Sequence, residues 1–296
     1  LESEIKELKN LIKNKDEQLT KIDYETKEVL EYFKKNKFVS DRRTIIKPLL
    51  EEEYEDIEEI IEEEPYLFVL SKNNWVQFIR GHENFKAIKY KDGDEKKFVL
   101  LVKNTDKLLL ASNSGRVYTL SLSNMNINKG YGSPLRLFID LPSEDAIQAI
   151  NKFNKNHKVL VASSSYKGFI VPDMKDLLAY TKLGKNILSL SSDEKLLVFR
   201  IVNNEDDSIA IIGENHKLLI FKLSDMPLQS KGKGVILQKS KQGNLTDATT
   251  FIFSEGIVCI RDNSKKIFKD LDLWLGKRAQ SGRLAPRGFP RSNRFS

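Results

Sequence analysis

A pair of short apolar runs recurs five times between residues 66 and 268. The first runs start 41 to 51 residues apart and span 66–70, 107–111, 157–161, 208–212 and 256–260. The second runs follow after a polar turn and span 75–79, 117–122, 168–171, 218–223 and 266–268. Runs rich in Val, Ile and Leu between Gly, Asn, Ser and Asp predict strands. Repeats of this length with several strands are typical of propeller blades.

Three of the units share a small basic glycine turn that leads into a further strand. The turns are 129–132, 182–185 and 231–234, and the expected strands after them are 135–139, 187–190 and 235–238. We therefore expect a mainly β fold, a propeller-like pinwheel of five four-stranded blades that closes or spirals around an axis. Such an arrangement leaves only short sheet edges.

The N-terminal part has a different pattern. We expect one long helix over residues 1–38, because apolar residues follow a heptad spacing that only Lys15 and Thr26 interrupt. The seam consists of Ile5, Leu8, Ile12, Leu19, Ile22, Val29 and Phe33. A solvent-exposed apolar stripe of this length requires a packing partner.

The chain is predicted to have three parts: a helix and junction over 1–48, an acidic linker over 49–64 and the β domain over 65–296, with a basic tail over 277–296. The linker has ten acids and no base between Glu51 and Glu64. It is either a solvated connector or a competitor of DNA for the basic domain.

Charge is distributed unevenly. Residues 1–64 carry 12 basic and 20 acidic residues, a net charge of −8, whereas residues 65–296 carry 37 and 22, a net charge of +15. This split favours a polyanionic partner for the β domain.

The basic turns place Lys129, Lys182, Lys185, Lys231 and Lys233 at equivalent points of successive units. In a propeller these points lie along one rim, where glycine lets the backbone approach a phosphate and lysine adds charge without reading sequence. We predict that the rim binds and bends duplex DNA. The alternative is that the turns are ordinary solvent-exposed loops. Further candidate DNA-binding residues are Arg136, Lys239, Arg278, Arg283 and Arg287.

The last twenty residues contain six basic residues and no acid, and their prolines and glycines exclude a helix. Two interpretations remain open. The tail is either an unstructured polycation that adds affinity, or a strap that packs on the propeller and closes its last, incomplete blade.

No pattern for catalysis or metal binding is found. The histidines His82, His157 and His216 match no metal spacing, and nucleotide-binding loops are absent. Cys259 lies in an apolar run and is expected to be a small buried hydrophobe of a protein in a reducing cytosol. No apolar run reaches the ~20 residues that a membrane helix needs.

Several stretches resemble the family of gyrase and topoisomerase IV A subunits, and topoisomerase IV most closely. They are 106–120, 129–141, 213–221, 231–239 and 276–295. The run Ser40-Asp-Arg-Arg-Thr44 resembles the junction that leads from the breakage-reunion core of these subunits to their C-terminal domain.

This resemblance implies a β-pinwheel whose outer rim binds DNA and helps to select the segment to be transported. It further implies pairing with an ATPase B subunit, an A2B2 heterotetramer that uses Mg²⁺ and ATP in decatenation and relaxation, and no cofactor in this stretch itself. The expected location is cytoplasmic and nucleoid-associated, with a peripheral position at the inner membrane left open.

Two departures from the family pattern matter. The family's nucleophilic tyrosine follows an arginine, and none of the nine tyrosines here does. The sequence is therefore expected to be a fragment that does not cut DNA by itself. The Gln-Arg-Arg-Gly-Gly-x-Gly box of gyrase A has no intact copy, and 231–234 is its nearest remnant. This favours bending without full chiral wrapping. The alternatives are a protein-interaction propeller and the wrapping domain of a gyrase A subunit.

Overall fold

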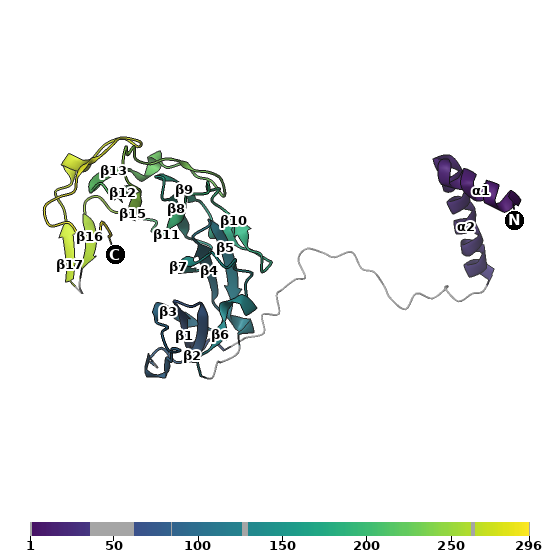
Figure 1. Cartoon of the computed structure of the whole chain (residues 1–296), viewed down its shortest axis with the longest axis horizontal. Coiled ribbons are helices and arrows are strands. Elements are labelled where there is room, and N and C mark those ends of the chain that lie inside the picture. The colour runs from purple at the N-terminus through teal and green to yellow at the C-terminus, as the bar shows by residue number, and fades with distance from the viewer. Residues whose placement is uncertain (1, 36–61, 84, 126–129, 262–263, 296) are drawn as a thin grey trace. The chain divides into compact units, whose positions relative to one another are not determined.

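The computed structural model describes residues 2–35, 62–83, 85–125, 130–261 and 264–295 (Figure 1). The chain divides into two compact units, Leu1–Ile60 and Ile61–Ser296. Most of the acidic linker and the junction at 40–44 therefore lie outside the described residues, and the expectations for them stay predictions. We describe each unit by itself.

The first unit contains two helices, α1 (Glu2–Lys13) and α2 (Lys15–Lys35), so the prediction of one continuous helix is wrong. The break falls at Asn14, whose side-chain oxygen accepts a hydrogen bond from the Asp16 backbone N–H at 3.2 Å. Gln18 spans the break and donates its side-chain N–H to the Leu11 carbonyl at 2.7 Å. Asparagine favours helix ends because its side chain competes for backbone partners. The apolar seam stays exposed, from Ile5 at 47% to Ile12 at 76%.

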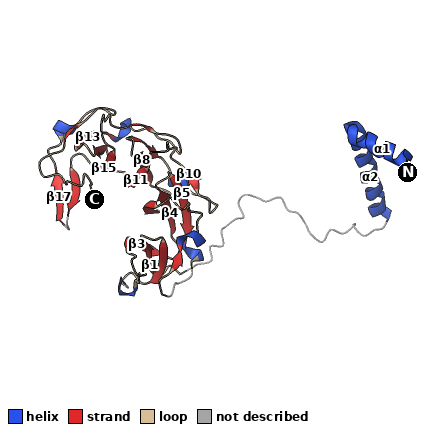
Figure 2. Cartoon of the chain, in the orientation of Figure 1, coloured by secondary structure: helices blue, strands red, loops and turns tan. Residues whose placement is uncertain are grey.

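The second unit consists of five antiparallel sheets in chain order (Figure 2). The first three strands of the four larger sheets are β1 (Pro65–Ser71), β2 (Trp75–Arg80) and β3 (Lys96–Lys103); β4 (Lys107–Ser112), β5 (Arg116–Ser121) and β7 (Ile147–Lys152); β8 (Lys158–Ser163), β9 (Lys167–Val171) and β11 (Leu196–Val202); and β12 (Ser208–Gly213), β13 (Lys217–Lys222) and β15 (Leu245–Phe251). The fifth sheet is β16 (Ile257–Arg261) with β17 (Ser264–Phe268). The five predicted strand pairs are confirmed.

The fourth strand of each larger sheet arrives from further along the chain. These two-residue strands are β6 (Ser133–Pro134), β10 (Lys185–Asn186), β14 (Val235–Ile236) and β18 (Arg283–Leu284). Each pairs with the second strand of the preceding blade, as β6 pairs with β2 although β4 and β5 lie between them in sequence. We call the stretches that carry these strands the returning segments and define them as 130–141, 178–190, 227–241 and 273–285.

A glycine precedes each of these short strands and has positive φ. The four glycines are Gly132, Gly184, Gly234 and Gly282. A Cβ on Gly132 would lie 2.1 Å from the Val76 carbonyl oxygen, and one on Gly282 would lie 2.6 Å from that of Leu218. These turns therefore need glycine both for their backbone conformation and for close contact with the second strand.

Two predicted features of the blades need correction. The stretch 135–139 contains a 3₁₀ turn, Leu135–Leu137, rather than a strand, and the strand expected at 187–190 lies two residues earlier, at Lys185–Asn186. The fifth sheet has two strands among the described residues, not four.

Apolar cores lie between successive sheets, and each inner sheet contributes to two of them. In β4, Leu108 and Leu110 face the core shared with the first sheet, while Leu109 and Ala111 face the core shared with the third. Alternate residues of a strand point to opposite faces. Burial on both faces explains why the runs at 108–111 and 209–212 are apolar throughout rather than alternating.

Four cores join the five sheets in sequence: the first sheet to the second, and so on to the fifth. Among the described residues no core joins the fifth sheet back to the first. The second unit is thus an open arc with these two sheets at its ends (Figure 1). Cys259 is buried in the core between the fourth and fifth sheets, and burial raises the pKa of its thiol to about 11. This agrees with the prediction of a small buried hydrophobe.

The substitution Gly132→Ala should destabilise the second unit by about 3 kcal/mol or more, because it combines left-handed backbone strain with a clash against the Val76 carbonyl. Gly93→Ala is the matched control. Gly93 has a φ of +77°, but nothing lies within 4 Å of its added Cβ, so only about 1 kcal/mol of strain is expected. Urea unfolding of both variants tests this, and equal losses would contradict the contact.

Glu194 should make the free energy of unfolding of the second unit depend on pH in the acidic range. Its carboxylate accepts hydrogen bonds from Lys167 at 2.8 Å and from the Ser191 N–H at 3.1 Å, and these bonds, with one from Ser165, lower its pKa from 4.5 to about 2. The ionised form is therefore favoured on folding. This stabilisation is complete above pH 4.5 and is lost as the pH falls through 2.

Glu194→Gln should remove at most about 3 kcal/mol near neutral pH, and the difference from the wild type should shrink to nothing near pH 2. Glu205→Gln, which changes an exposed acid between β11 and β12, is the control. Denaturant unfolding across this pH range measures both. A difference that stays constant with pH would exclude the proposed role of the carboxylate.

Candidate nucleic-acid interface

The returning segments are hydrogen-bonded to one another as well as to the blades. The Asp140 N–H donates to the Lys182 carbonyl at 2.9 Å, and the Ser189 N–H donates to that of Gly232 at 2.9 Å. The Lys239 N–H donates to the Gln280 carbonyl at 3.0 Å. Each bond joins one segment to the next, so the four segments form a continuous backbone strip along the outer strands. This strip is the rim that the repeated basic turns predicted.

The two glycines of each Gly-x-Gly turn have different surroundings. Gly132 and Gly234 pack against the second strand of a blade, so their missing side chains face protein rather than a ligand. Gly130 has nothing within 4 Å of an added Cβ, and Gly232 meets only the Gln229 side chain at 3.3 Å. Open space therefore lies beside the first glycine of each pair and protein beside the second, and the approach of a phosphate to these turns stays a prediction.

Most of the candidate basic residues lie on the strip. Lys231 and Lys233 are exposed in the third returning segment. Lys182 donates to the Leu137 carbonyl at 2.9 Å, and Arg136 donates to the Ser143 hydroxyl at 3.3 Å, so both link neighbouring parts of the rim. Lys129 lies outside the described residues.

Two of the candidate basic residues, Lys185 and Arg278, make hydrogen bonds within the protein. Lys185 is half-buried, and its ammonium donates to the Asp176 carbonyl. Arg278 donates to the Ile236 carbonyl at 2.9 Å and thus ties the tail to β14. Lys239, Arg283 and Arg287 are exposed.

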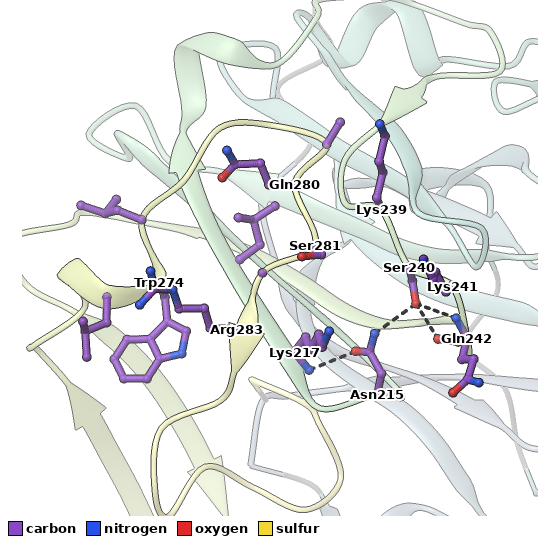
Figure 3. A pocket seen from close by; sticks show the side chains of 15 residues that line it. Asn215, Lys217, Lys239, Ser240, Lys241, Gln242, Trp274, Gln280, Ser281 and Arg283 are labelled. Atoms are coloured by element: carbon purple, nitrogen blue, oxygen red, sulfur yellow. Dashed lines mark hydrogen bonds between the residues drawn. The ribbon is translucent and has the colours of Figure 1, made fainter.

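The structure brings Lys239 and Arg283 together in one groove (Figure 3). The groove has a volume of about 1120 Å³ and is lined by residues of three stretches, 215–219, 239–242 and 273–283. Lys217 and Lys241 also line it, and none of its lining residues is acidic. Within the described part of the chain, these four cations have no ion-pair partner. The groove is therefore a concentration of uncompensated positive charge.

Hydrogen bonds hold the walls of this groove. Asn215 donates to the Ser240 hydroxyl at 3.0 Å, which joins the turn before β13 to the third returning segment (Figure 3). The buried Gln238 side chain donates to the carbonyls of Lys217 and Ser281, at 3.2 and 2.9 Å. The Trp274 indole N–H donates to the Leu284 carbonyl at 2.7 Å. The cations thus project from a fixed frame.

Lys217 and Lys241 were not among the residues predicted from the sequence. Lys217 starts β13, and the equivalent first residues of β5 and β9 are also basic, Arg116 and Lys167. This repeat and the density of basic residues at 231–241 were the available signals, but the proximity of Lys217 to the tail depends on the pairing of β13 with β18.

The tail packs on the β domain over its described residues, which contradicts the unstructured polycation and agrees with a strap. The prediction that the strap closes the last blade is wrong, because its strand completes the fourth sheet and the fifth keeps two described strands. The strap completes the fourth sheet through β18 and also contacts the fifth. Phe289 and Phe295 are buried in the core between these sheets. The Ile260 N–H donates to the Phe295 carbonyl at 3.0 Å, and Asn293 donates to the Gly213 carbonyl at 3.0 Å.

A buried carboxylate marks the end of the strap. Asp247 on β15 accepts a hydrogen bond from the Phe295 N–H at 2.9 Å and lies beside Arg200. Burial raises the pKa of Asp247, and the nearby Arg200 guanidinium opposes this increase. The position of the last residues is thus defined by a polar contact as well as by apolar packing.

No protein-family model matches the chain, but curated relatives and solved structures do. The A subunit of DNA topoisomerase 4 from Rickettsia bellii is 37% identical over 291 residues, which are 98% of this chain and 39% of the relative. The structure of the E. coli ParC C-terminal domain aligns with a TM-score of 0.67 at 25% identity and covers 77% of this chain and 96% of that one. The chain belongs with the C-terminal regions of topoisomerase IV A subunits.

The fold is accordingly the β-pinwheel that the resemblance implied. The DNA gyrase A C-terminal domain shares it, with a TM-score of 0.54 at 18% identity, covering 74% of this chain and 76% of that one. This second likeness concerns the fold alone. The chain spans about two fifths of the length of the curated topoisomerase relatives, 39% for the Rickettsia bellii protein. Among the described helices, none is long and apolar enough to cross a membrane.

Removal of the Phe289 ring should release the strap, because this ring packs against Phe268, Phe295 and His216. Phe289→Ala is expected to cost about 3 kcal/mol and to open trypsin sites at Arg283 and Arg287. Leu284→Ala, at a residue with 67% exposure, is the control and should leave the cleavage rate unchanged. Equal cleavage of the wild type and Phe289→Ala would show that the ring does not hold the tail.

Proposed function

We propose that the second unit binds duplex DNA along the returning segments and bends it, as the C-terminal domain of a topoisomerase IV A subunit. The observation that carries the proposal is the continuous strip of returning segments, whose lysines converge with Arg283 on a groove without acids. Phosphates are the ligands that such a surface suits, and contacts to them are largely independent of base sequence.

The curvature of the arc supports bending. The strip follows the outer strands of four successive sheets, so a duplex that contacts more than one returning segment must curve with them. Bending 20–30 base pairs by 40–90° costs on the order of 1–6 kcal/mol, which several phosphate contacts can offset. A strip that ends at the fourth of five sheets, on an arc without ring closure among the described residues, suits a bend rather than a full wrap.

In the intact enzyme this domain would help to capture the DNA segment that is transported during ATP-dependent decatenation and relaxation. We infer an A2B2 heterotetramer with an ATPase B subunit, located in the cytoplasm at the nucleoid. Mg²⁺ and ATP would act in parts of that assembly other than this domain, which has no proposed catalytic residue and would not cut DNA alone.

The acidic linker is a candidate competitor of DNA for the basic residues of the β domain. Its last residues contact the first blade, where Glu63 pairs with Lys103 and Glu64 pairs with Arg80. These exposed pairs contribute little stability. They support the proposal that linker acids lie against basic residues of the β domain when DNA is absent.

The affinity of residues 62–296 for a 30-base-pair duplex should fall linearly with the logarithm of salt concentration. Replacing Lys231 and Lys233 with Ala should weaken binding to every sequence alike and reduce the slope by about one to two, since two phosphate contacts are lost. The control replaces Lys155, in the turn before β8, and Lys158, at the start of β8; both are exposed, and the slope should stay unchanged.

Fluorescence anisotropy over a salt series measures both slopes. A flat response of the wild type would exclude DNA as the ligand and favour a protein-interaction propeller. A loss confined to one DNA sequence would contradict phosphate contact.

A further inference from the structure

The returning segments carry most of the exposed apolar surface as well as the lysines. Thirteen large apolar side chains are exposed in the described part of the second unit, and nine of them lie on these segments. The nine are Tyr131, Leu137, Tyr180, Leu183, Leu228, Ile236, Leu273, Leu275 and Leu284. Single exposed apolar residues are ordinary, but their concentration on one strip indicates a contact surface.

The apolar residues also recur in register. Tyr131 and Leu183 each stand one residue before the turn glycine that packs on the preceding blade, and they are 50% and 60% exposed. Ile236 and Leu284 each form the second residue of a returning strand, and they are 45% and 67% exposed. Each of these two positions thus carries a large exposed apolar side chain in two successive segments, and the position before the turn glycine is Lys233 or Ser281 in the other two.

The turns hold these side chains rigidly. Gly132 and Gly184 are fixed by backbone contact with Val76 and Val117, and the strands after them are paired with β2 and β5. A side chain one residue before such an anchored glycine has little freedom to fold back. Its exposure is therefore imposed by the fold, next to the basic residues of the same turn.

Phosphate contact alone does not account for an apolar group at this position. Proteins that bend DNA commonly press apolar side chains against the base edges of a groove, where they displace water. An apolar group on a strip that also carries basic residues fits that chemistry, since the basic residues contact the phosphates.

We propose that Tyr131 and Leu183 are wedge residues, which press on the face of the bound duplex that meets the strip, between its phosphate contacts, and localise its bend. The proposal rests on the DNA-binding function inferred above. In this arrangement the lysines supply affinity and salt dependence, and the apolar pair supplies the direction and size of the bend.

The test uses residues 62–296 and a 30-base-pair duplex with a donor and an acceptor dye at its ends. Tyr131→Ser combined with Leu183→Ser should reduce the change in energy transfer on binding by at least about half and weaken affinity about fivefold, with an unchanged salt slope. Tyr131→Phe keeps the ring and should keep the bend. Leu101→Ser, at a β3 residue that is 47% exposed, is the control outside the strip and should behave as the wild type.

The outcomes separate the two proposals. Wild-type bending and affinity in the double variant would overturn the wedge while leaving DNA binding intact. A fall in the salt slope would also overturn it, because the residues would then act only by positioning the lysines. Absence of binding by the wild type itself would remove the proposed function and the wedge together. Thermal unfolding of each variant checks that loss of bending does not reflect loss of the fold.

Discussion

The second unit depends on one repeated contact, in which a glycine turn presses its backbone against the second strand of the preceding blade. At Gly132 and Gly282 any side chain would overlap a carbonyl oxygen of that strand. The two-residue strand that follows completes a sheet begun by another repeat. No blade is therefore complete by itself, and the stability of each depends on its neighbour, as in other repeat proteins. The apolar cores between sheets extend the same dependence across both faces.

The same contact generates the candidate interface. Because each returning strand lies at the outer edge of a sheet, its turn is carried to the rim of the arc, and backbone hydrogen bonds then align successive turns. Because the turns lie at the rim, their lysines and their exposed apolar side chains lie along the same strip. DNA affinity and bending would thus share one scaffold, with charge and shape assigned to different positions of the same turn.

The last returning segment differs from the other three because its strand lies in the basic tail. It supplies the fourth strand of the fourth sheet through Gly282 and Arg283. Phe289 and Phe295 then continue into the last core and leave the fifth sheet with two strands among the described residues. The strap also forms one wall of the cationic groove. An element that looked like a charged appendage is therefore part of both the fold and the candidate site.

The sequence by itself determined the strands, the number of repeats and the basic character of the rim, because these depend on residue type and spacing within a few positions. It also marked Lys231, Lys233 and Arg283 as candidates. Tertiary structure alone decided which sheet each short strand completes, since a two-residue strand has too little local pattern to specify its partner. It also decided that Lys217 and Arg283 line one groove, because β13 pairs with β18 from a distant stretch of the chain. The helix break at Asn14 could be predicted only in part. Asparagine is a known helix-capping residue, but the apolar seam continues regularly on both sides of it and favoured one continuous helix.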